Sequence, residues 1–370
     1  MAGIYIHIPF CASRCIYCDF FSTTSLGKRD EYVRAVCREL DTRSQYLNEE
    51  VETIYFGGGT PSQLTSEQIS TILSSIYNIY NVREEAEITV EGNPDDLSLE
   101  YLTALRAIGI NRLSMGVQSF DDEVLRFINR RHSTLQAENA VQNAKACGFD
   151  NISIDLMFGF PKQSLSDWQR DVDRAVSLGV QHLSAYSLMY EEGTRLTKML
   201  EQGDIQEIDE ELSLAMYEYL IDALAKAGYE HYEISNFCKP GMHSRHNSSY
   251  WHGVPYLGVG AGAHSYNGES RHYNPDSLSE YLRGSELVTE QLTLSQRYDE
   301  YVFTGLRTRG GIMLSEIESV FGENYRTYCL ENAQKHISDG TLFLEGDNLR
   351  LSRKGLFVSN DVMSDLMYIG

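Results

Sequence analysis

The first 230 residues or so repeat one pattern six times: a short β-rich run, a turn of glycine, proline or polar residues, and an amphipathic helical run. Strands that alternate with crossover helices imply a parallel sheet. Because no Gly-x-Gly-x-x-Gly turn follows a strand, the six units favour a barrel or partial barrel over a dinucleotide-binding fold. The predicted strands cover residues 4–8, 53–56, 87–91, 112–116, 151–157 and 182–187.

Polar residues gather where these predicted strands end. A cysteine-rich loop follows the first strand, and a Gly-Gly-Gly-Thr-Pro run at 57–61 follows the second. Glu91 closes the third strand, Gln118 follows the fourth, and Asp155 and Tyr186 lie near the ends of the fifth and sixth. In a barrel of parallel strands, the carboxyl ends surround the place where chemistry occurs. We therefore expect these residues to share one pocket.

The length of 370 residues exceeds what one hydrophobic core normally supports, so we expect a large domain and a smaller one. Residues 1–230 form the predicted partial barrel, and residues 231–289 form a connecting region. Within that region, the glycine-, histidine- and aromatic-rich stretch 232–273 indicates irregular structure. Residues 290–370 contain helical runs and a hairpin, which predicts a small, mostly helical, winged-helix-like domain. The helical runs cover 298–307, 314–320 and 325–336.

The charge balance argues against a nucleic-acid partner. Lys and Arg total 31 against 53 Asp and Glu, so the net charge is -22 and phosphate backbones should repel the chain. The segment 290–370 also holds more acidic than basic residues, 12 against 8. No apolar run approaches the roughly 18 residues of a membrane span, and the N-terminus lacks the pattern of a secretory signal. We therefore expect a cytoplasmic protein that does not cross a membrane.

Three cysteines suggest an inorganic centre. Cys11, Cys15 and Cys18 have the spacing C-x3-C-x2-C in one short loop, so three thiolates can converge there. The other four cysteines are dispersed, which does not fit a secreted disulfide framework. Zinc is the alternative, but a closed zinc site needs a fourth ligand that this loop does not contain. On a 4Fe-4S cluster, three thiolates leave one iron open, which suits catalysis rather than plain electron transfer.

This spacing, with the aromatic Tyr17 before the last cysteine, resembles the hallmark of the radical S-adenosylmethionine (SAM) proteins. The wider pattern resembles the branch that contains the oxygen-independent coproporphyrinogen oxidase HemN and the haem chaperone HemW, over nearly the whole chain. The resemblance implies a barrel of radical SAM type, a 4Fe-4S cluster on the three cysteines, and SAM on the open iron. It rests further on Tyr5-Ile6-His7-Ile8-Pro9-Phe10-Cys11, Gly57-Gly58-Gly59-Thr60-Pro61, Gly116-Val117-Gln118-Ser119 and Ile154-Asp155-Leu156.

The resemblance also assigns residues to the cofactor. Alternation along the first strand places Tyr5 and His7 on one face and three isoleucines on the other, so Tyr5 can reach SAM. Gly58 and Gly59 let the backbone approach the methionine amino group without an intervening Cβ. Glu91 resembles the carboxylate that accepts hydrogen bonds from the ribose hydroxyls. The set implied for SAM is Tyr5, Tyr17, Gly58, Gly59, Thr60, Glu91, Gln118, Arg130 and Asp155, and no residue is assigned a catalytic role.

Three of these assignments have simpler alternatives. Glu91 and Asp155, at the ends of strands, could serve only as helix caps. Arg130 stands beside Arg131, and an exposed pair of arginines is usually a solvated surface.

Two departures from the oxidase pattern favour the chaperone. The oxidases carry a further cysteine two positions beyond the third, where this chain has Phe20. They also carry an N-terminal segment ahead of the first strand, which here is predicted to begin within four residues of Met1. The resemblance therefore implies a carrier that delivers haem to apo-haemoproteins such as respiratory enzymes. The alternative is an enzyme, either the oxidase itself or another radical SAM enzyme that acts on a tetrapyrrole.

The segment His246-Asn247-Ser248-Ser249-Tyr250-Trp251 resembles the H-N-x-x-Y-W motif of the haem chaperones. Imidazole is a common axial ligand of haem iron, so His246 is the predicted haem contact. On residue type alone, a loop histidine is more often structural, and His243, His252 and His264 are nearby substitutes. The relatives also imply a homodimer that depends on the cluster.

Overall fold

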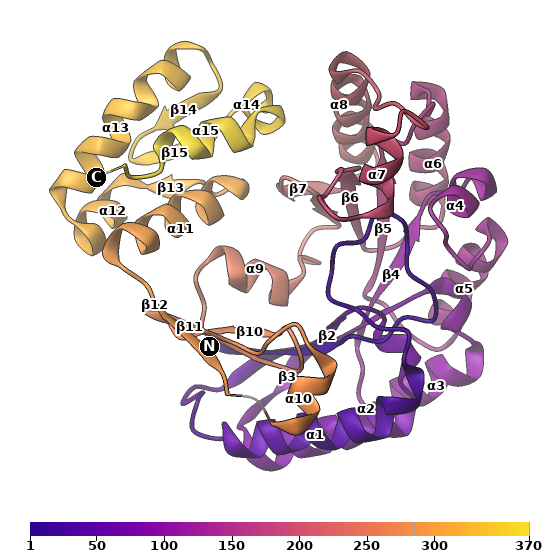
Figure 1. Cartoon of the computed structure of the whole chain (residues 1–370). Helices are drawn as coiled ribbons and strands as arrows, with labels where there is room; N and C mark the ends of the chain where they lie inside the picture. Colours follow the sequence, from indigo (N-terminus) through magenta and orange to yellow (C-terminus); the bar gives the residue numbers. More distant parts are fainter. Residues whose placement is uncertain (285, 370) are drawn as a thin grey trace.

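The computed structural model describes residues 1–284 and 286–369 and has an α/β architecture built on one twelve-stranded sheet. At its centre, six parallel strands pair in chain order (Figure 1). All six predicted strands are present, so the predicted α/β class with a mostly parallel sheet is confirmed. They are β1 (Ala2–Ile8), β2 (Val51–Gly58), β3 (Val82–Gly92), β4 (Arg112–Gln118), β5 (Ile152–Phe158) and β6 (His182–Ser187).

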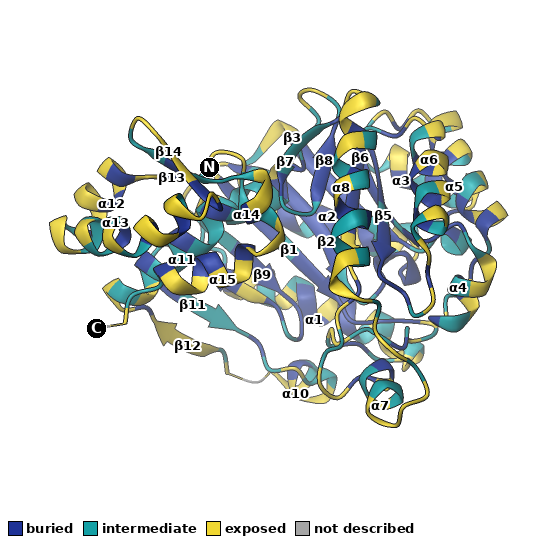
Figure 2. Cartoon of the chain, turned by 90° about the horizontal axis from the view of Figure 1, so that it is seen from above, coloured by how far each residue is buried: buried dark blue, intermediate teal, exposed yellow. Residues whose placement is uncertain are grey.

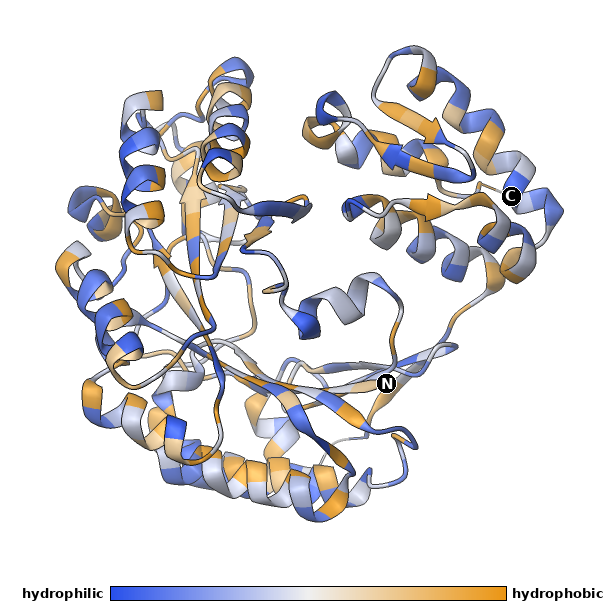
Figure 3. Ribbon diagram, turned by 180° about the vertical axis from the view of Figure 1, so that it is seen from behind, coloured by the Kyte–Doolittle hydropathy of each residue, from blue (hydrophilic) through white to orange (hydrophobic). Residues whose placement is uncertain are grey.

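Helices connect these strands, and the longer ones cover the outer face of the curved sheet (Figure 1). Their apolar stripes face the sheet and are buried there, while their outer sides are polar and exposed (Figures 2 and 3). Helix α2 begins with a capping box formed by Thr65 and Gln68. The helices are α1 (Arg29–Thr42), α2 (Ser66–Ile79), α3 (Leu99–Ala107), α4 (Asp122–Phe127), α5 (Thr134–Ala146), α6 (Leu165–Ser177), α7 (Arg195–Glu201) and α8 (Glu210–Lys226).

The sheet continues beyond both edges of this parallel core, in the order β12-β11-β10-β9-β1 on one side and β6-β8-β7 on the other. The expectation of irregular structure over 232–273 is therefore wrong. Its strands have only three or four residues, too few for a periodic pattern, and they depend on partners distant in sequence. The elements are β7 (Glu230–Glu233), β8 (Asn236–Cys238), α9 (Arg245–Trp251), β9 (Tyr256–Val259), β10 (His264–Tyr266), β11 (Ser270–Tyr273), α10 (Leu278–Arg283) and β12 (Val288–Gln291).

The C-terminal elements surround a second hydrophobic cluster, which includes Tyr298, Val302 and Leu349. Their order of helix, strand, two helices and a hairpin agrees with the predicted winged-helix-like character. The predicted helices and hairpin are present, whereas the short β13, α14 and α15 were missed. The division at residues 230 and 289 stays a prediction. The elements are α11 (Leu294–Arg307), β13 (Ile312–Met313), α12 (Leu314–Phe321), α13 (Glu323–Ser338), β14 (Leu342–Glu345), β15 (Asn348–Leu351), α14 (Arg353–Phe357) and α15 (Ser359–Leu366).

Helix α9 occupies the concave side of the sheet, between the sheet and the C-terminal elements (Figure 1). The H-N-x-x-Y-W segment forms most of this helix, which places it inside the barrel. Across residues 1–284 and 286–369, no helix combines the length and the apolar character needed to cross a bilayer.

Candidate functional site

The cysteine motif lies in the loop between β1 and α1, directly after the C-terminal end of β1. The chain folds back on itself there, because the Cys11 backbone N–H donates to the carbonyl oxygen of Thr23 at 2.9 Å. Cys11 is buried, Cys15 and Cys18 are half-buried, and all three are free thiols. The loop thus presents three unpaired sulfur ligands in one place.

The separation of these sulfurs distinguishes two kinds of centre. A single tetrahedral zinc ion holds two thiolates about 3.8 Å apart, given Zn–S bonds of about 2.3 Å. Among the described residues, these cysteines form no group whose ligand atoms all lie within 4.8 Å of one another. A cluster of several irons spreads its thiolates farther apart than one metal ion does. The loop is thus not preformed around a single ion, and the preference for a cluster over zinc rests on the resemblance of its cysteine spacing.

The glycine run at the end of β2 packs closely against the motif and the residues before it. A Cβ atom on Gly59 would lie 3.1 Å from Cys11 Sγ and closer still to the backbone of the preceding loop. Gly58 has a φ of +109°, and a Cβ there would lie 2.6 Å from the His7 ring. A side chain at either position would have to displace a neighbour. Thr60 completes the run, with Oγ1 3.4 Å from Cys11 Sγ.

Arg130 approaches the motif from the loop between α4 and α5. Its Nη1 lies 3.5 Å from Cys15 Sγ, and its Nη2 donates to Asn93 Oδ1 at 2.7 Å and to the carbonyl oxygen of Gly116. Gln118 approaches the same glycine, because a Cβ on Gly116 would lie 2.9 Å from Gln118 Nε2. The guanidinium thus joins the cysteine loop to the ends of two strands.

The alternative in which Arg130 and Arg131 form a solvated pair is wrong, because their side chains take different partners. Arg131 forms ion pairs with Asp95 at 3.1 Å and with Asp96 at 2.9 Å. Tyr17 lies close to Cys15 and Arg130.

A polar cavity of about 190 Å³ adjoins this region inside the barrel. Within it, the Tyr55 hydroxyl donates to Glu91 Oε1 at 2.6 Å. Burial raises the pKa of Glu91 to about 7, and the nearby Asp155 carboxylate acts in the same direction. Burial also raises the pKa of Asp155. Two carboxyl groups therefore face a space that favours a ligand able to donate hydrogen bonds to them. The lining comprises Tyr5, Tyr55, Glu91, Arg112, Ser114, Asp155, Ser184, Tyr186, His246, Asn247 and Tyr250.

His246 belongs to this cavity and is fully buried. Its Nδ1 lies 2.8 Å from Thr53 Oγ1, and its Nε2 lies 2.8 Å from the Tyr250 hydroxyl. The ring stacks on Tyr55 at a centroid distance of 5.0 Å. Burial lowers the pKa of His246 to about 3, so the ring is neutral. Both nitrogens are engaged within the chain, and ligation of haem iron by this ring requires that one of these hydrogen bonds opens.

The residues predicted for the site thus fall into two neighbouring groups. The glycine run connects them, because a Cβ on Gly57 would lie 2.9 Å from the rings of both Tyr5 and Tyr55. The group near the cysteine loop comprises Cys11, Cys15, Cys18, Tyr17, Gly58, Gly59, Thr60, Gln118 and Arg130. The cavity group comprises Tyr5, Glu91, Asp155 and His246.

Sequence reasoning missed three residues of this region. Arg112 is 1% exposed, and its Nε and Nη1 have no hydrogen-bond partner among the described residues. An arginine that begins an otherwise apolar strand was a usable signal, because a buried charge is rarely incidental. Tyr55 lies two residues before Gly57 and therefore on the same face of its strand. Its position next to the glycine run was a second usable signal. Asn93 carried no such signal.

Comparisons with known proteins add a family context. The family model of the Radical SAM superfamily matches residues 5–175, and that of the HemN C-terminal domain matches residues 292–358. The protein named "Heme chaperone HemW" from Lactococcus lactis is 34% identical over 368 residues, which cover 98% of this chain and 96% of the relative. The protein of the same name from Mycobacterium tuberculosis is 36% identical over 376 residues, which cover 99% and 94%.

The fold also has a solved counterpart. The coproporphyrinogen III oxidase HemN from Escherichia coli, described as a radical SAM enzyme, superposes with a TM-score of 0.85 and 25% sequence identity. The superposition covers 99% of this chain and 90% of that protein. Both the barrel and the C-terminal elements therefore have counterparts in one known structure.

Proposed function

The chain belongs to the radical SAM superfamily, in the family of the haem chaperone HemW and the oxidase HemN, and from this membership we propose that it is a haem chaperone. The proposed resident groups are a 4Fe-4S cluster and SAM, and the proposed cargo is haem. The proposed recipients are apo-haemoproteins.

The residues present fit a cluster and SAM. Three free thiols stand in one loop, which supplies the donor set of three thiolates that such a cluster takes. The backbone at Gly58 and Gly59 approaches His7 and the cysteine loop so closely that only glycine fits there without displacing a neighbour. Cys11, Cys15 and Cys18 would hold the cluster and leave one iron for SAM. When bound, the reduced cluster supplies an electron that can cleave a carbon–sulfur bond of SAM.

The remaining side chains orient and neutralise these groups. Arg130 places its charge beside Cys15, where it would partly offset the negative charge of a thiolate-bound cluster. Glu91 and Asp155 are half-buried acceptors that line the cavity, suited to the hydroxyl groups of a ribose. Tyr55 fixes the orientation of Glu91 through the 2.6 Å hydrogen bond. The amide of Gln118 lies beside Gly116 at the end of β4.

One observation carries the haem part of the proposal: the H-N-x-x-Y-W segment packs against the cofactor cavity. His246 stacks on Tyr55, and Tyr55 donates to Glu91, so only one side chain separates the predicted haem contact from the predicted ribose acceptor. The other end of α9 faces a second cavity of about 390 Å³, where Trp251 and His252 contribute to the lining. Haem near this helix would thus lie within reach of both the motif and the cofactor site.

The proposal is tested by loading the cluster-reconstituted chain with haem under anaerobic conditions and mixing it with an apo-cytochrome b. A chaperone that hands haem over directly gives a transfer rate that rises with acceptor concentration. Transfer at a fixed rate, set only by haem dissociation, would reject delivery. Haem titration of His246→Ala, and of His252→Ala as one of its nearby substitutes, then tests which ring binds the iron, because loss of the iron ligand changes the haem absorption spectrum.

The second candidate is the oxidase activity of the structural counterpart. It is favoured by the TM-score of 0.85 to HemN and disfavoured by Phe20, which replaces the further cysteine of the oxidase pattern. Anaerobic incubation of the reconstituted chain with SAM, a reductant and coproporphyrinogen tests it. Formation of protoporphyrinogen would establish the oxidase and overturn the chaperone.

A further inference from the structure

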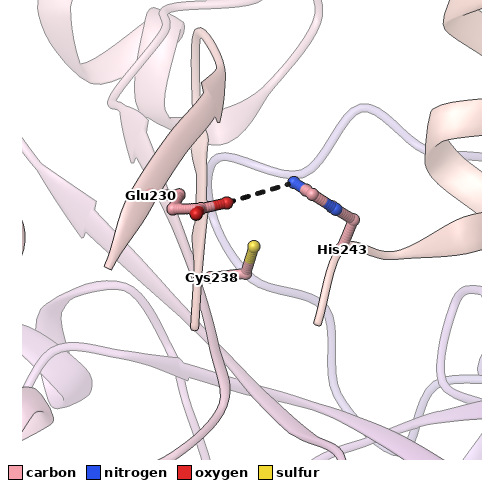
Figure 4. Close-up of side chains that lie close together, drawn as sticks. All are labelled: Glu230, Cys238 and His243. Atoms are coloured by element: carbon pink, nitrogen blue, oxygen red, sulfur yellow. Dashed lines mark ion pairs between the residues drawn. The ribbon is translucent and has the colours of Figure 1, made fainter. Parts of the chain in front are cut away.

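A second group of metal-binding side chains lies away from the cysteine motif, at the far edge of the sheet. Strands β7 and β8 form an antiparallel hairpin in which Glu230 stands directly opposite Cys238. Directly opposite residues in an antiparallel pair project from the same face, so the carboxylate and the thiol are neighbours. His243 comes from the loop that follows β8, and Figure 4 shows its imidazole turned towards the other two side chains.

The distances suit one metal ion. One ligand atom from each of the three residues lies within 4.8 Å of the others, and no other group of three in the described chain meets this criterion. Glu230 Oε2 and His243 Nε2 are 3.8 Å apart. In a tetrahedral zinc site, a nitrogen and an oxygen ligand stand about 3.3 Å apart, given bonds of about 2.0 Å. The two side chains therefore need to close by only about 0.5 Å.

The donor set identifies the class of metal. Sulfur, imidazole nitrogen and carboxylate oxygen together match Zn²⁺, whereas calcium and magnesium take oxygen ligands. A thiolate and a carboxylate carry two negative charges, which neutralise a divalent cation with a neutral imidazole as the third ligand. We propose that Glu230, Cys238 and His243 bind one Zn²⁺. On binding, the Cys238 thiol loses its proton to solvent and the sulfur–zinc bond forms.

The exposure of the three residues indicates how the ion reaches the site and which coordination position it leaves to solvent. Cys238 is fully buried, while the Glu230 and His243 side chains are 43% and 41% exposed. Both also line the 390 Å³ cavity beside α9, so the ion has a path from solvent to the sulfur. Three protein ligands leave the fourth tetrahedral position to water.

The ion would fasten the hairpin to the segment that leads into the H-N-x-x-Y-W helix. His243 directly precedes Ser244, whose side chain accepts a hydrogen bond from the Asn247 backbone N–H at the start of α9. The His243 ring also packs edge-to-face on Tyr232 at 4.6 Å, which limits its orientation. Zinc therefore holds the entry to α9 in place without contacting the cysteine motif.

X-ray absorption at the zinc edge tests the site in the cluster-loaded chain, because iron does not contribute at that edge. The expected result after one equivalent of Zn²⁺ and desalting is one zinc per chain, with one sulfur neighbour at about 2.3 Å and nitrogen or oxygen neighbours at about 2.0 Å. Three sulfur neighbours would place zinc on the cysteine motif and overturn the proposal, as would an absence of retained zinc.

Substitutions test the assignment of each ligand through zinc affinity, measured by competition with a chromophoric chelator. Removal of a residue that only hydrogen-bonds to a metal ligand lowers metal affinity about 10–100-fold. Removal of a ligand itself should therefore lower zinc affinity at least about 100-fold. Cys238→Ser is the direct test. His243→Gln changes a half-exposed side chain and gives the same information if Cys238→Ser, at a buried position, prevents folding.

Matched controls are available in the same chain. Cys329→Ser changes a buried cysteine in the C-terminal cluster, and His252→Gln changes a histidine that lines the same cavity outside the group of three. Both should keep the wild-type zinc affinity. Unchanged affinity in both Cys238→Ser and His243→Gln would overturn the proposal. So would a His243→Gln variant that keeps zinc but loses haem, because the ring would then serve haem. Haem delivery can fail while zinc binds, so the two proposals are separable.

Discussion

Replacement of Glu91 by glutamine is expected to stabilise the cofactor-free chain at pH 8. The reason is that Glu91 lines the cavity beside Asp155, and burial raises its pKa from 4.5 to about 7. At pH 8 the folded chain therefore holds an ionised carboxylate at a position that disfavours charge. Glutamine has nearly the same shape, carries no charge, and retains an oxygen that can accept the hydrogen bond from Tyr55.

The magnitude follows from the two pKa values. A difference of about 2.5 units corresponds to about 3 kcal/mol, since each unit represents about 1.4 kcal/mol. Because the folded chain binds this proton more tightly than the unfolded chain, the penalty is fully present above pH 7 and disappears as the pH falls towards 4.5. The neutral amide oxygen of glutamine accepts weaker hydrogen bonds than a carboxylate does, which reduces the stabilisation by about 1–2 kcal/mol. The expected net stabilisation at pH 8 is about 1–2 kcal/mol, and it should approach zero at pH 5.

Urea unfolding of wild type and Glu91→Gln at pH 5 and pH 8, without cluster or SAM, measures this difference. Glu84→Gln, at an exposed position on β3, is the control and should change stability by less than about 0.5 kcal/mol. The cluster-loaded variant should bind SAM more weakly in calorimetry, since it lacks the anionic acceptor. An equal change in stability at both pH values would refute the reasoning, because the effect would then not depend on the ionisation of Glu91.

Three further predictions concern the cysteine loop, α9 and assembly. Gly59→Ala should destabilise the fold by about 1–3 kcal/mol and lower the iron retained per chain, because the new Cβ meets Cys11 Sγ. Iron analysis checks this against Gly27→Ala, whose Cβ meets no atom within 4 Å. Equal iron contents in the two variants would contradict the prediction. His246→Ala should lower the free energy of unfolding by about 2–4 kcal/mol, because Thr53 and Tyr250 lose their hydrogen-bond partner. Urea unfolding measures this, with His252→Ala at an exposed position as the control. Equally small effects of the two substitutions would count against the prediction. Size-exclusion chromatography should show a doubled mass after anaerobic cluster reconstitution, and no change would remove the proposed homodimer.

The parallel core was predictable because its signals are local. Each strand carries an apolar run, as in β1 where Ile4, Ile6 and Ile8 are fully buried, and each is followed by a helix with its own periodicity. The cysteine spacing was equally local, since all three residues lie within one loop. Such patterns can be interpreted without knowing how distant parts of the chain fold.

Helix α9 shows what the sequence could not supply. Its seven residues contain no apolar periodicity, and its first turn depends on a carboxylate from a distant strand. Glu87 of β3 accepts hydrogen bonds from the backbone N–H groups of Arg245 at 3.2 Å and His246 at 3.0 Å. An anion at a helix N-terminus satisfies otherwise unpaired donors, but this one is more than 150 residues away in sequence. The motif could therefore be recognised while its position inside the barrel could not.

Electron paramagnetic resonance of the reduced, reconstituted chain, recorded with and without SAM, tests the central claim most directly. The account predicts a 4Fe-4S signal whose shape changes when SAM occupies the open iron, and loss of that signal in Cys11→Ser, Cys15→Ser and Cys18→Ser. Cys37→Ser, at a cysteine on α1 outside the motif, should behave like wild type. A signal that SAM leaves unchanged, or one that survives removal of the three cysteines, would contradict the account.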